Sequence, residues 1–231
     1  MRLWPVGWRR VEELLLLPKS VTQSPMRVDY ERHSTARMFQ SEFLETCSKI
    51  HPVTPFLVYV PVVLGTLTYG LARGITTVGM TGLFFGVGFG VWCTMEYSLH
   101  RFLFHWEGSG PLTRRFHDII HGYHHRYPDD PLRLVMPLGA SIPLGILVAG
   151  LLWWVGRPAV TLPLYAGIVA GYLFYDFMHW AVHARTPVTA WGKALRSHHM
   201  AHHFAVPDKN FGISHRWLDA LVGTLKRRTT V

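Results

Sequence analysis

Four apolar stretches, each about 20 residues long, most strongly constrain what this chain can fold into. They cover about residues 52–72, 75–99, 134–155 and 159–182 of the 231-residue sequence. A segment of this length can cross the hydrocarbon core of a membrane as an α-helix, which satisfies its own backbone hydrogen bonds. The sequence therefore predicts an all-α integral membrane protein with four transmembrane helices.

Very short connections join the first stretch to the second and the third to the fourth, so we expect two helical hairpins. Of the 23 Lys and Arg residues, only Arg73 and Arg157 lie in these connections. Because positively charged segments tend to stay in the cytoplasm, both termini and the central loop should face that side. The membrane would be the endoplasmic reticulum or a bacterial inner membrane.

The basic residues flank the apolar stretches, and the formal net charge is +9. This arrangement favours contact with anionic lipids and argues against a nucleic-acid partner.

We expect residues 1–50 to form a cytosolic or interfacial segment, in which Trp4, Trp8 and residues 14–17 could lie along the membrane surface. Residues 51–231 would form the membrane domain. Glycines repeat at four-residue spacing at Gly82, Gly86 and Gly90 and again at Gly167 and Gly171. Small residues at this spacing predict that the membrane helices pack closely.

Ten histidines form four tight clusters at the edges of the apolar stretches. The clusters are His100 and His105; His121, His124 and His125; His179 and His183; and His199, His202 and His203. In three clusters the spacing places the imidazoles on one face of a helix. Residues five apart, as in the first cluster, are separated by roughly 140° on an α-helix. That pair can converge only if the helix is distorted or ends between its members, or the two serve different metal ions.

Clustered imidazoles are typical of transition-metal sites. One ion takes about four to six ligands, so ten histidines suit two ions. Imidazole binds iron, zinc, copper and nickel, which leaves the metal open. The only cysteines are Cys47 and Cys93, which argues against an iron–sulfur cluster and most structural zinc sites.

Several other polar residues could orient ligand imidazoles through hydrogen bonds. Asp176 lies three residues before His179 on the same helical face, although it could instead satisfy a buried polar neighbour. The further candidates are His117, His198, His215, Asp219 and Glu96. We expect no catalytic residue beyond the metal ligands.

Around these residues the chain resembles the membrane fatty acid hydroxylase/sterol desaturase superfamily. The segments that carry the resemblance are EYSLHRFLFH (96–105), HGYHHRYPDDPLRLVMP (121–137), YDFMHWAVH (175–183), SHHMAHHF (197–204) and NFGIS (210–214). The histidine motifs indicate the superfamily, whereas RLVMP and NFGIS point to the fatty acid 2-hydroxylase branch.

The resemblance implies four membrane helices capped by a cytosolic helical module that holds two metal ions on the ten histidines. It implies iron as the working metal, with zinc able to occupy the sites in purified protein, and dioxygen as cosubstrate. The expected reaction is hydroxylation of a long acyl chain at its α-carbon, free or in a sphingolipid. Alternatives are a sterol, carotenoid or ether-lipid oxidase of the same superfamily. A metal-binding or metal-transport membrane protein is a further alternative, which ligands at the helix ends disfavour.

Many members of this superfamily carry an N-terminal haem domain that donates electrons. The first 50 residues lack its haem-binding histidine pattern, so we expect a separate donor, a small cytochrome or a ferredoxin with its reductase. The acyl tail would lie among the membrane helices with its polar head at the cytoplasmic surface, which places the first carbons near the metals. Arg133, Tyr123 and Asn210 could contact that head.

Overall fold

The computed structural model describes residues 37–226. All the regular secondary structure in that range is helical, with loops between the helices. Most of the expected N-terminal segment, including Trp4 and Trp8, lies outside the described residues. The helices are, in order, α2 (Glu42–Cys47), α3 (Thr54–Ala72), α4 (Val78–Ser98), η2 (Leu99–Phe104), α5 (Pro111–His117), η3 (Asp118–Gly122), α6 (Tyr123–Arg126), α7 (Leu138–Val155), α8 (Pro158–Ala184), α9 (Ala190–Phe204) and α10 (Trp217–Val222). The elements η2 and η3 are π-helices.

Four of the described helices are long and apolar enough to cross a membrane, which agrees with the predicted number. They are Thr54–Ala72, Val78–Phe104, Leu138–Val155 and Pro158–Ala184. Each lies within a few residues of its predicted stretch, except that the second continues through η2 to Phe104. The extension carries His100 beyond the apolar part of α4 without a break in the helix.

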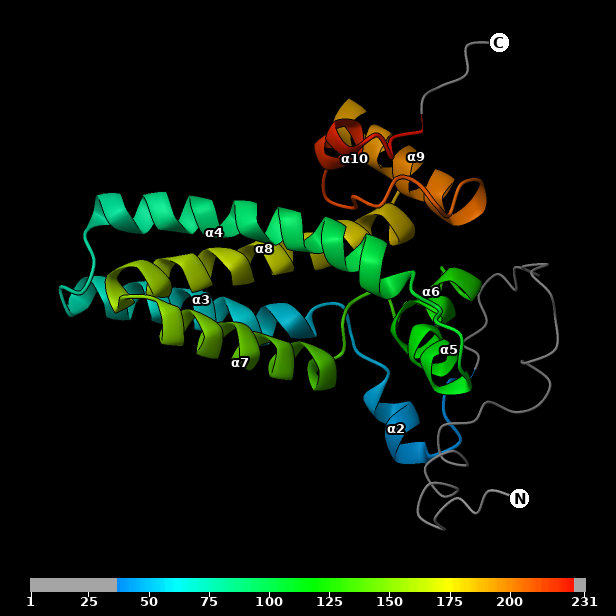
Figure 1. Cartoon of the computed structure of the whole chain (residues 1–231), viewed down its shortest axis with the longest axis horizontal. Coiled ribbons are helices and arrows are strands. Elements are labelled where there is room, and N and C mark those ends of the chain that lie inside the picture. The colour runs from blue at the N-terminus through cyan, green and yellow to red at the C-terminus, as the bar shows by residue number, and fades with distance from the viewer. Residues whose placement is uncertain (1–36, 227–231) are drawn as a thin grey trace.

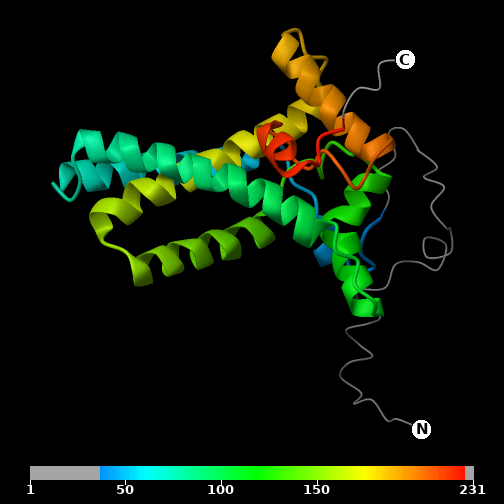
Figure 2. The same cartoon turned by 45° about the horizontal axis from the view of Figure 1, so that its top comes forward.

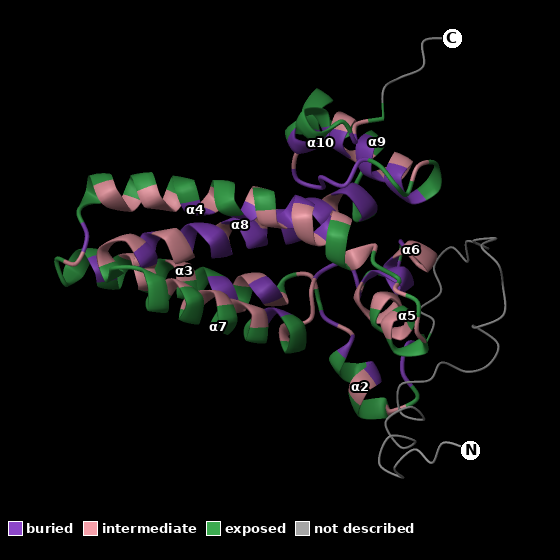
Figure 3. Cartoon of the chain, in the orientation of Figure 1, coloured by how far each residue is buried: buried purple, intermediate pink, exposed green. Residues whose placement is uncertain are grey.

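Helix α8 is the centre of the bundle. In its apolar part 56% of the residues are buried, against 6% in α7, which lies at the edge of the bundle (Figure 3). The ring of Tyr172 on α8 meets the rings of Tyr59 on α3 and Trp92 on α4 edge-on, each with a centroid distance of 5.4 Å. Such edge-to-face contacts add to the burial of apolar surface, so these three helices form the core.

Glycines allow α4 and α8 to approach closely, as the sequence predicts, but not all at the predicted positions. A Cβ atom at Gly167 would lie 2.1 Å from the carbonyl oxygen of Phe85, and one at Gly88 would lie 2.1 Å from that of Leu164. The prediction for Gly82, Gly86 and Gly90 is wrong, because a side chain there would meet nothing within 4 Å. The four-residue repeat marks one face of α4, but it is Gly88 on another face that meets α8.

The shorter helices gather at the end of the bundle where α4 and α8 terminate (Figures 1 and 2). Helix α4 runs into η2, and a short loop connects α8 to α9. Helices η3 and α6 lie between α5 and α7 in the chain and reach the same end. The histidines of all four sequence clusters are thereby carried to one helical module.

Candidate metal centre

The ten clustered histidines converge in two groups of five. Group A consists of His100, His105, His121, His125 and His202, and group B of His124, His179, His183, His199 and His203. Within each group the five candidate ligand nitrogens all lie within 4.8 Å of one another. This spacing is compatible with one ion held by each group.

The two groups divide the sequence clusters rather than following them. The Nε2 atom of His121 lies 2.9 Å from that of His125, and both point into group A. The intervening His124 turns to group B, where its Nε2 atom lies 3.0 Å from that of His203. Neighbouring histidines of one short segment therefore serve two sites, and each site draws its imidazoles from several helices.

A π-helical turn explains how His100 and His105 converge. The backbone N–H of His105 donates to the carbonyl of His100, five residues earlier, at 3.3 Å. In a π-helix this longer hydrogen bond brings residues five apart to the same side. The two Nε2 atoms consequently lie 3.3 Å apart in group A. Of the alternatives that the spacing allows, the structure shows the distorted helix.

Burial keeps the imidazoles neutral. His100, His199 and His202 are completely buried. Burial, and secondly the neighbouring histidines, lower the pKa of His105 to about 3 and hold the pKa of His121 well below the usual value. A neutral imidazole offers a lone pair to a metal ion, whereas a protonated one cannot. The donor set of both groups therefore fits two transition-metal ions.

Backbone carbonyls orient three of these histidines. The Nδ1 atoms of His100, His202 and His179 donate to carbonyl oxygens. The acceptors are Phe211 at 2.5 Å, Lys209 at 2.7 Å and Leu134 at 2.8 Å, respectively. A bond at Nδ1 fixes the tautomer and points Nε2 into the site. Two of these acceptors lie in NFGIS and RLVMP, so the motifs flagged in the sequence contribute main-chain atoms.

The model of the family described as "Fatty acid hydroxylase" matches residues 85–224, which is more than half of the chain and includes all ten histidines. The chain belongs to this family. Dihydroceramide fatty acyl 2-hydroxylase FAH2 of Arabidopsis thaliana is 34% identical over 82% of this chain and 79% of its own length. Fatty acid 2-hydroxylase of Homo sapiens is 32% identical over 82% of this chain and 56% of its own length.

A solved structure shares the fold of this fatty acid hydroxylase. Full-length scs7p, of which only the hydroxylase domain is visible, superimposes with a TM-score of 0.76 and is 29% identical. The alignment covers 81% of this chain and 71% of scs7p. Both the sequence relatives and this structure are hydroxylases by name, so this chain is an oxidoreductase enzyme of the fatty acid hydroxylase family.

The residues expected to orient ligand imidazoles lie around the two groups. Within the described residues, however, their side chains bond to groups other than the ten histidines. Asp176 accepts from the backbone N–H of Met136 at 3.4 Å, which corresponds to the alternative role considered for it. The Nδ1 atom of His117 donates to the carbonyl of Phe104 at 2.7 Å. His198 and Asp219 are bonded to each other at 3.1 Å. Glu96 accepts from the backbone N–H of Ile213 at 2.7 Å, and His215 contacts the Ser214 hydroxyl at 3.2 Å.

Arg133, Tyr123 and Asn210 have structural partners rather than an open position toward a lipid head. Arg133 is buried and donates to Glu45 at 2.6 Å, to Asp130 at 2.8 Å and to the Tyr123 hydroxyl at 2.7 Å. This network ties α2 to the loop that carries Leu134. Asn210 is also buried, with its side chain bonded to backbone groups. The expectation that these residues meet the substrate head is therefore not supported by their position.

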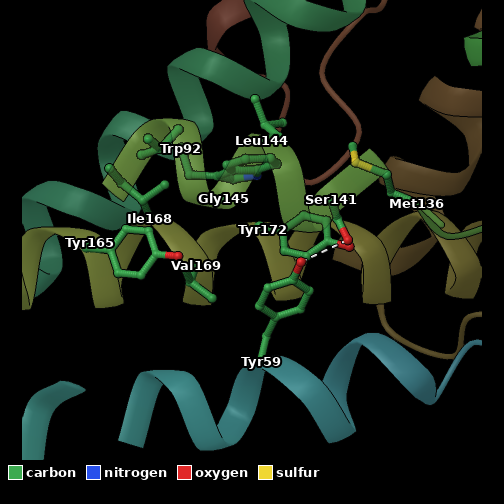
Figure 4. Close-up of a pocket in the computed structure, with 11 residues that line it drawn as sticks. Tyr59, Trp92, Met136, Ser141, Leu144, Gly145, Tyr165, Ile168, Val169 and Tyr172 are labelled. Atoms are coloured by element: carbon green, nitrogen blue, oxygen red, sulfur yellow. Dashed lines mark hydrogen bonds between the residues drawn. The ribbon is translucent and has the colours of Figure 1, made fainter. Parts of the chain in front are cut away.

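An apolar pocket lies between α3, α4, α7 and α8 of the hydroxylase (Figure 4). The pocket is partly open, and its walls include Trp92, Gly145 and Tyr172. The hydroxyl of Tyr59 donates to that of Ser141 at 2.9 Å at one side of the pocket (Figure 4). Tyr172 precedes His179 by two helical turns on α8, so the pocket lies roughly 10 Å from group B along the helix axis.

Proposed function

We propose that this fatty acid hydroxylase uses two iron ions and dioxygen to hydroxylate a long acyl chain at its α-carbon, free or within a sphingolipid. The observation that carries the proposal is the position of two five-histidine groups beside an apolar pocket. The names of the relatives support the substrate class, since they act on fatty acyl chains and dihydroceramide.

Groups A and B would each hold one iron ion. A pair of iron ions held there would activate dioxygen, the oxidant needed to break an unactivated C–H bond, which side chains alone cannot do. The chain contributes neutral imidazoles at fixed positions. Zinc binds such ligands more tightly than ferrous iron and could therefore occupy both sites in purified protein.

The pocket would receive the acyl tail. Its apolar walls on α4, α7 and α8 suit a hydrocarbon chain, and the helix axis of α8 leads from it to His179. The polar head would then lie beyond the metal ions, in the helical module. This arrangement brings the first carbons of the acyl chain, rather than its far end, to the metals, which supports the α-carbon as the position of attack.

The four long helices would form two hairpins, with residues 51–231 as one membrane domain and the metal centre on the cytoplasmic side. The distribution of Lys and Arg supports this orientation. The membrane would be the endoplasmic reticulum or a bacterial inner membrane. A separate small cytochrome or a ferredoxin with its reductase would bring the electrons to the centre from the cytoplasm.

Mass spectrometry of host lipids, with and without expression of the chain, tests the proposed reaction. The cells should be aerobic and should contain a competent reductase. We expect a new 2-hydroxylated acyl species that is absent when His121→Ala is expressed at the same level. The complete absence of a new oxygenated acyl species would contradict the proposal.

The same lipid extract distinguishes the alternatives. An oxygenated sterol, an oxygenated carotenoid or a cleaved ether lipid would place the chain elsewhere in its superfamily. Metal transport is disfavoured because the histidines lie at the ends of the long helices and beyond them, and not along a route through the bundle.

A further inference from the structure

One short loop orients two histidines of group A. The carbonyl oxygens of Lys209 and Phe211 accept hydrogen bonds from the Nδ1 atoms of His202 and His100, at 2.7 Å and 2.5 Å. In group B, the corresponding carbonyl belongs to Leu134 in a different loop. Whatever fixes the backbone of residues 209–214 therefore fixes two imidazoles of group A and none of group B.

Asp219 on α10 holds the first half of this loop. Its Oδ1 atom accepts from the backbone N–H of Phe211 at 2.9 Å, and its Oδ2 atom accepts from that of Gly212 at 2.8 Å. The hydroxyl of Thr224 and the Nε2 atom of His198 complete its partners, at 2.7 Å and 3.1 Å. The carboxylate is completely buried, and these bonds hold its pKa below the usual value even though burial opposes them.

Glu96 on α4 holds the second half. Its Oε1 atom accepts from the backbone N–H groups of Ile213 and Ser214, at 2.7 Å and 2.8 Å, and its Oε2 atom accepts from the Ser214 hydroxyl. Four consecutive backbone N–H groups, those of residues 211–214, are thus bonded to two buried carboxylates from two different helices. Buried charges are costly unless hydrogen bonds satisfy them. The two carboxylates therefore depend on the loop's N–H groups, just as the loop depends on the carboxylates.

The backbone of the loop has little freedom to move. A Cβ atom at Gly212 would lie 2.1 Å from the carbonyl oxygen of His215 and 3.0 Å from Oδ2 of Asp219. Asn210 adopts a left-handed conformation (φ 60°), and its side chain donates to the carbonyl of His198 at 3.2 Å. Close packing and these bonds leave the Phe211 carbonyl in a single position.

We propose that Glu96 and Asp219 are positioning residues that set the metal affinity of group A through this loop. Neither carboxylate contacts a group A histidine, and both act through the carbonyls of Lys209 and Phe211. A fixed acceptor at Nδ1 holds the tautomer and the ring direction of a ligand histidine, and losing such a partner weakens metal binding by about tenfold to a hundredfold. The inference rests on the metal centre proposed above.

The two carboxylates should respond differently to the isosteric amide. Both oxygens of Asp219 accept a backbone N–H, so Asp219→Asn turns an NH₂ group against one of these donors and leaves it without an acceptor. In Glu96, a single oxygen accepts both backbone N–H groups, and the other faces a hydroxyl that can reverse its role. Glu96→Gln should therefore preserve the loop, whereas Glu96→Ala should not.

Zinc titration of the metal-stripped full-length protein, in competition with a chromophoric chelator, tests this. The wild type should bind two zinc ions. Asp219→Asn should weaken one of the two sites by about tenfold or more and leave the other unchanged, while Glu96→Gln should stay within about twofold of the wild type. Glu45→Gln is the matched control, because Glu45 is a buried carboxylate that also accepts two backbone N–H groups, but from Met38 and Phe39 and not from the loop of residues 209–214.

If each of the two sites binds zinc with the same affinity in Asp219→Asn as in the wild type, the inference is overturned. A wild type that binds no zinc would contradict the metal centre instead. Hydrogen–deuterium exchange of the wild-type protein provides a measurement that does not depend on a variant. The amides of residues 211–214 should stay protected after the metal is stripped, because carboxylates hold them. Exchange as fast as in the loop of residues 185–189 would count against the proposal.

Discussion

The Nε2 atom of His105 lies 3.3 Å from that of His100, because a π-helical turn joins residues that an α-helix would separate. An α-helix would place these two imidazoles on different sides and leave group A one ligand short. The extra residue in η2 is therefore a functional part of the proposed centre. π-Helical turns cost hydrogen-bond geometry and are frequent at functional sites.

Inserting one alanine after Phe102 in η2 should remove the metal from group A. Phe102 is 65% exposed, so the insertion point lies away from the core. The insertion sets the second histidine six residues after His100, a spacing that neither an α-helix nor a π-turn brings to one side. Elemental analysis of the purified protein should show one metal ion per chain in place of two. Phe102→Ala keeps the chain length and is the control, with two ions expected. Two ions in the insertion variant would show that the spacing set by the π-turn is not needed.

Substitutions at glycines should follow the α4–α8 contact rather than the sequence repeat. Gly167→Ala places a methyl group against the backbone of Phe85 and should destabilise the protein by about 1–3 kcal/mol. Gly86→Ala meets open space and should change stability by less than about 1 kcal/mol. Thermal unfolding in detergent compares the two. A larger loss at Gly86 than at Gly167 would contradict the observed packing.

Acid should weaken the link between α2 and the Arg133 network. Burial raises the pKa of Glu45, but its partners outweigh burial and lower that pKa to about 2. These partners are Lys49, the backbone N–H groups of Phe39 and Met38, and Arg133. The ionised carboxylate of Glu45 therefore stabilises the fold fully at a pH above about 4.5, the usual pKa of the group. This contribution is lost as the pH falls toward 2.

The difference in melting temperature between the wild type and Glu45→Gln measures this contribution. It should be constant from pH 7 to pH 5 and should shrink between about pH 4.5 and pH 2. A difference that does not change across that acidic range would show that Glu45 has an ordinary pKa in the folded protein.

Filling the pocket should change which acyl chains are accepted. Gly145 lines it, and a leucine there would occupy space that the acyl tail needs. In Gly145→Leu, hydroxylation of the longest chains should fall severalfold relative to shorter ones in the lipid profile. Gly150→Leu adds the same side chain on α7 where nothing lies within 4 Å, and should leave the profile unchanged. An identical profile in both variants would place the tail elsewhere.

Hydropathy and histidine spacing alone predict the four long helices and the residues of the candidate centre. Both signals are local, since a run of apolar residues and a cluster of imidazoles can be read without knowing what packs against them. The four-residue repeat of Gly82, Gly86 and Gly90 shows the limit of such reasoning. It defines a face of α4, but only the three-dimensional packing shows that Gly88 meets α8.

The division of the histidines into two groups could not be predicted in this way. His121 and His124 lie on one face of an ideal helix, yet they serve different groups because η3 and the partner helices determine where each ring points. The carbonyls of Leu134 and Phe211 leave no side-chain signal at all. The motifs RLVMP and NFGIS around them indicate a branch of the superfamily, but not that these carbonyls orient ligand histidines.

Isotope labelling tests whether the oxygen of dioxygen is placed on the α-carbon. Cells that express the chain are grown under ¹⁸O₂, and the acyl lipids are analysed by fragmentation mass spectrometry. We expect a hydroxyl group on the α-carbon that carries one ¹⁸O atom and is absent from cells expressing His121→Ala. A hydroxyl group labelled from water instead of dioxygen, or located away from the α-carbon, would contradict it.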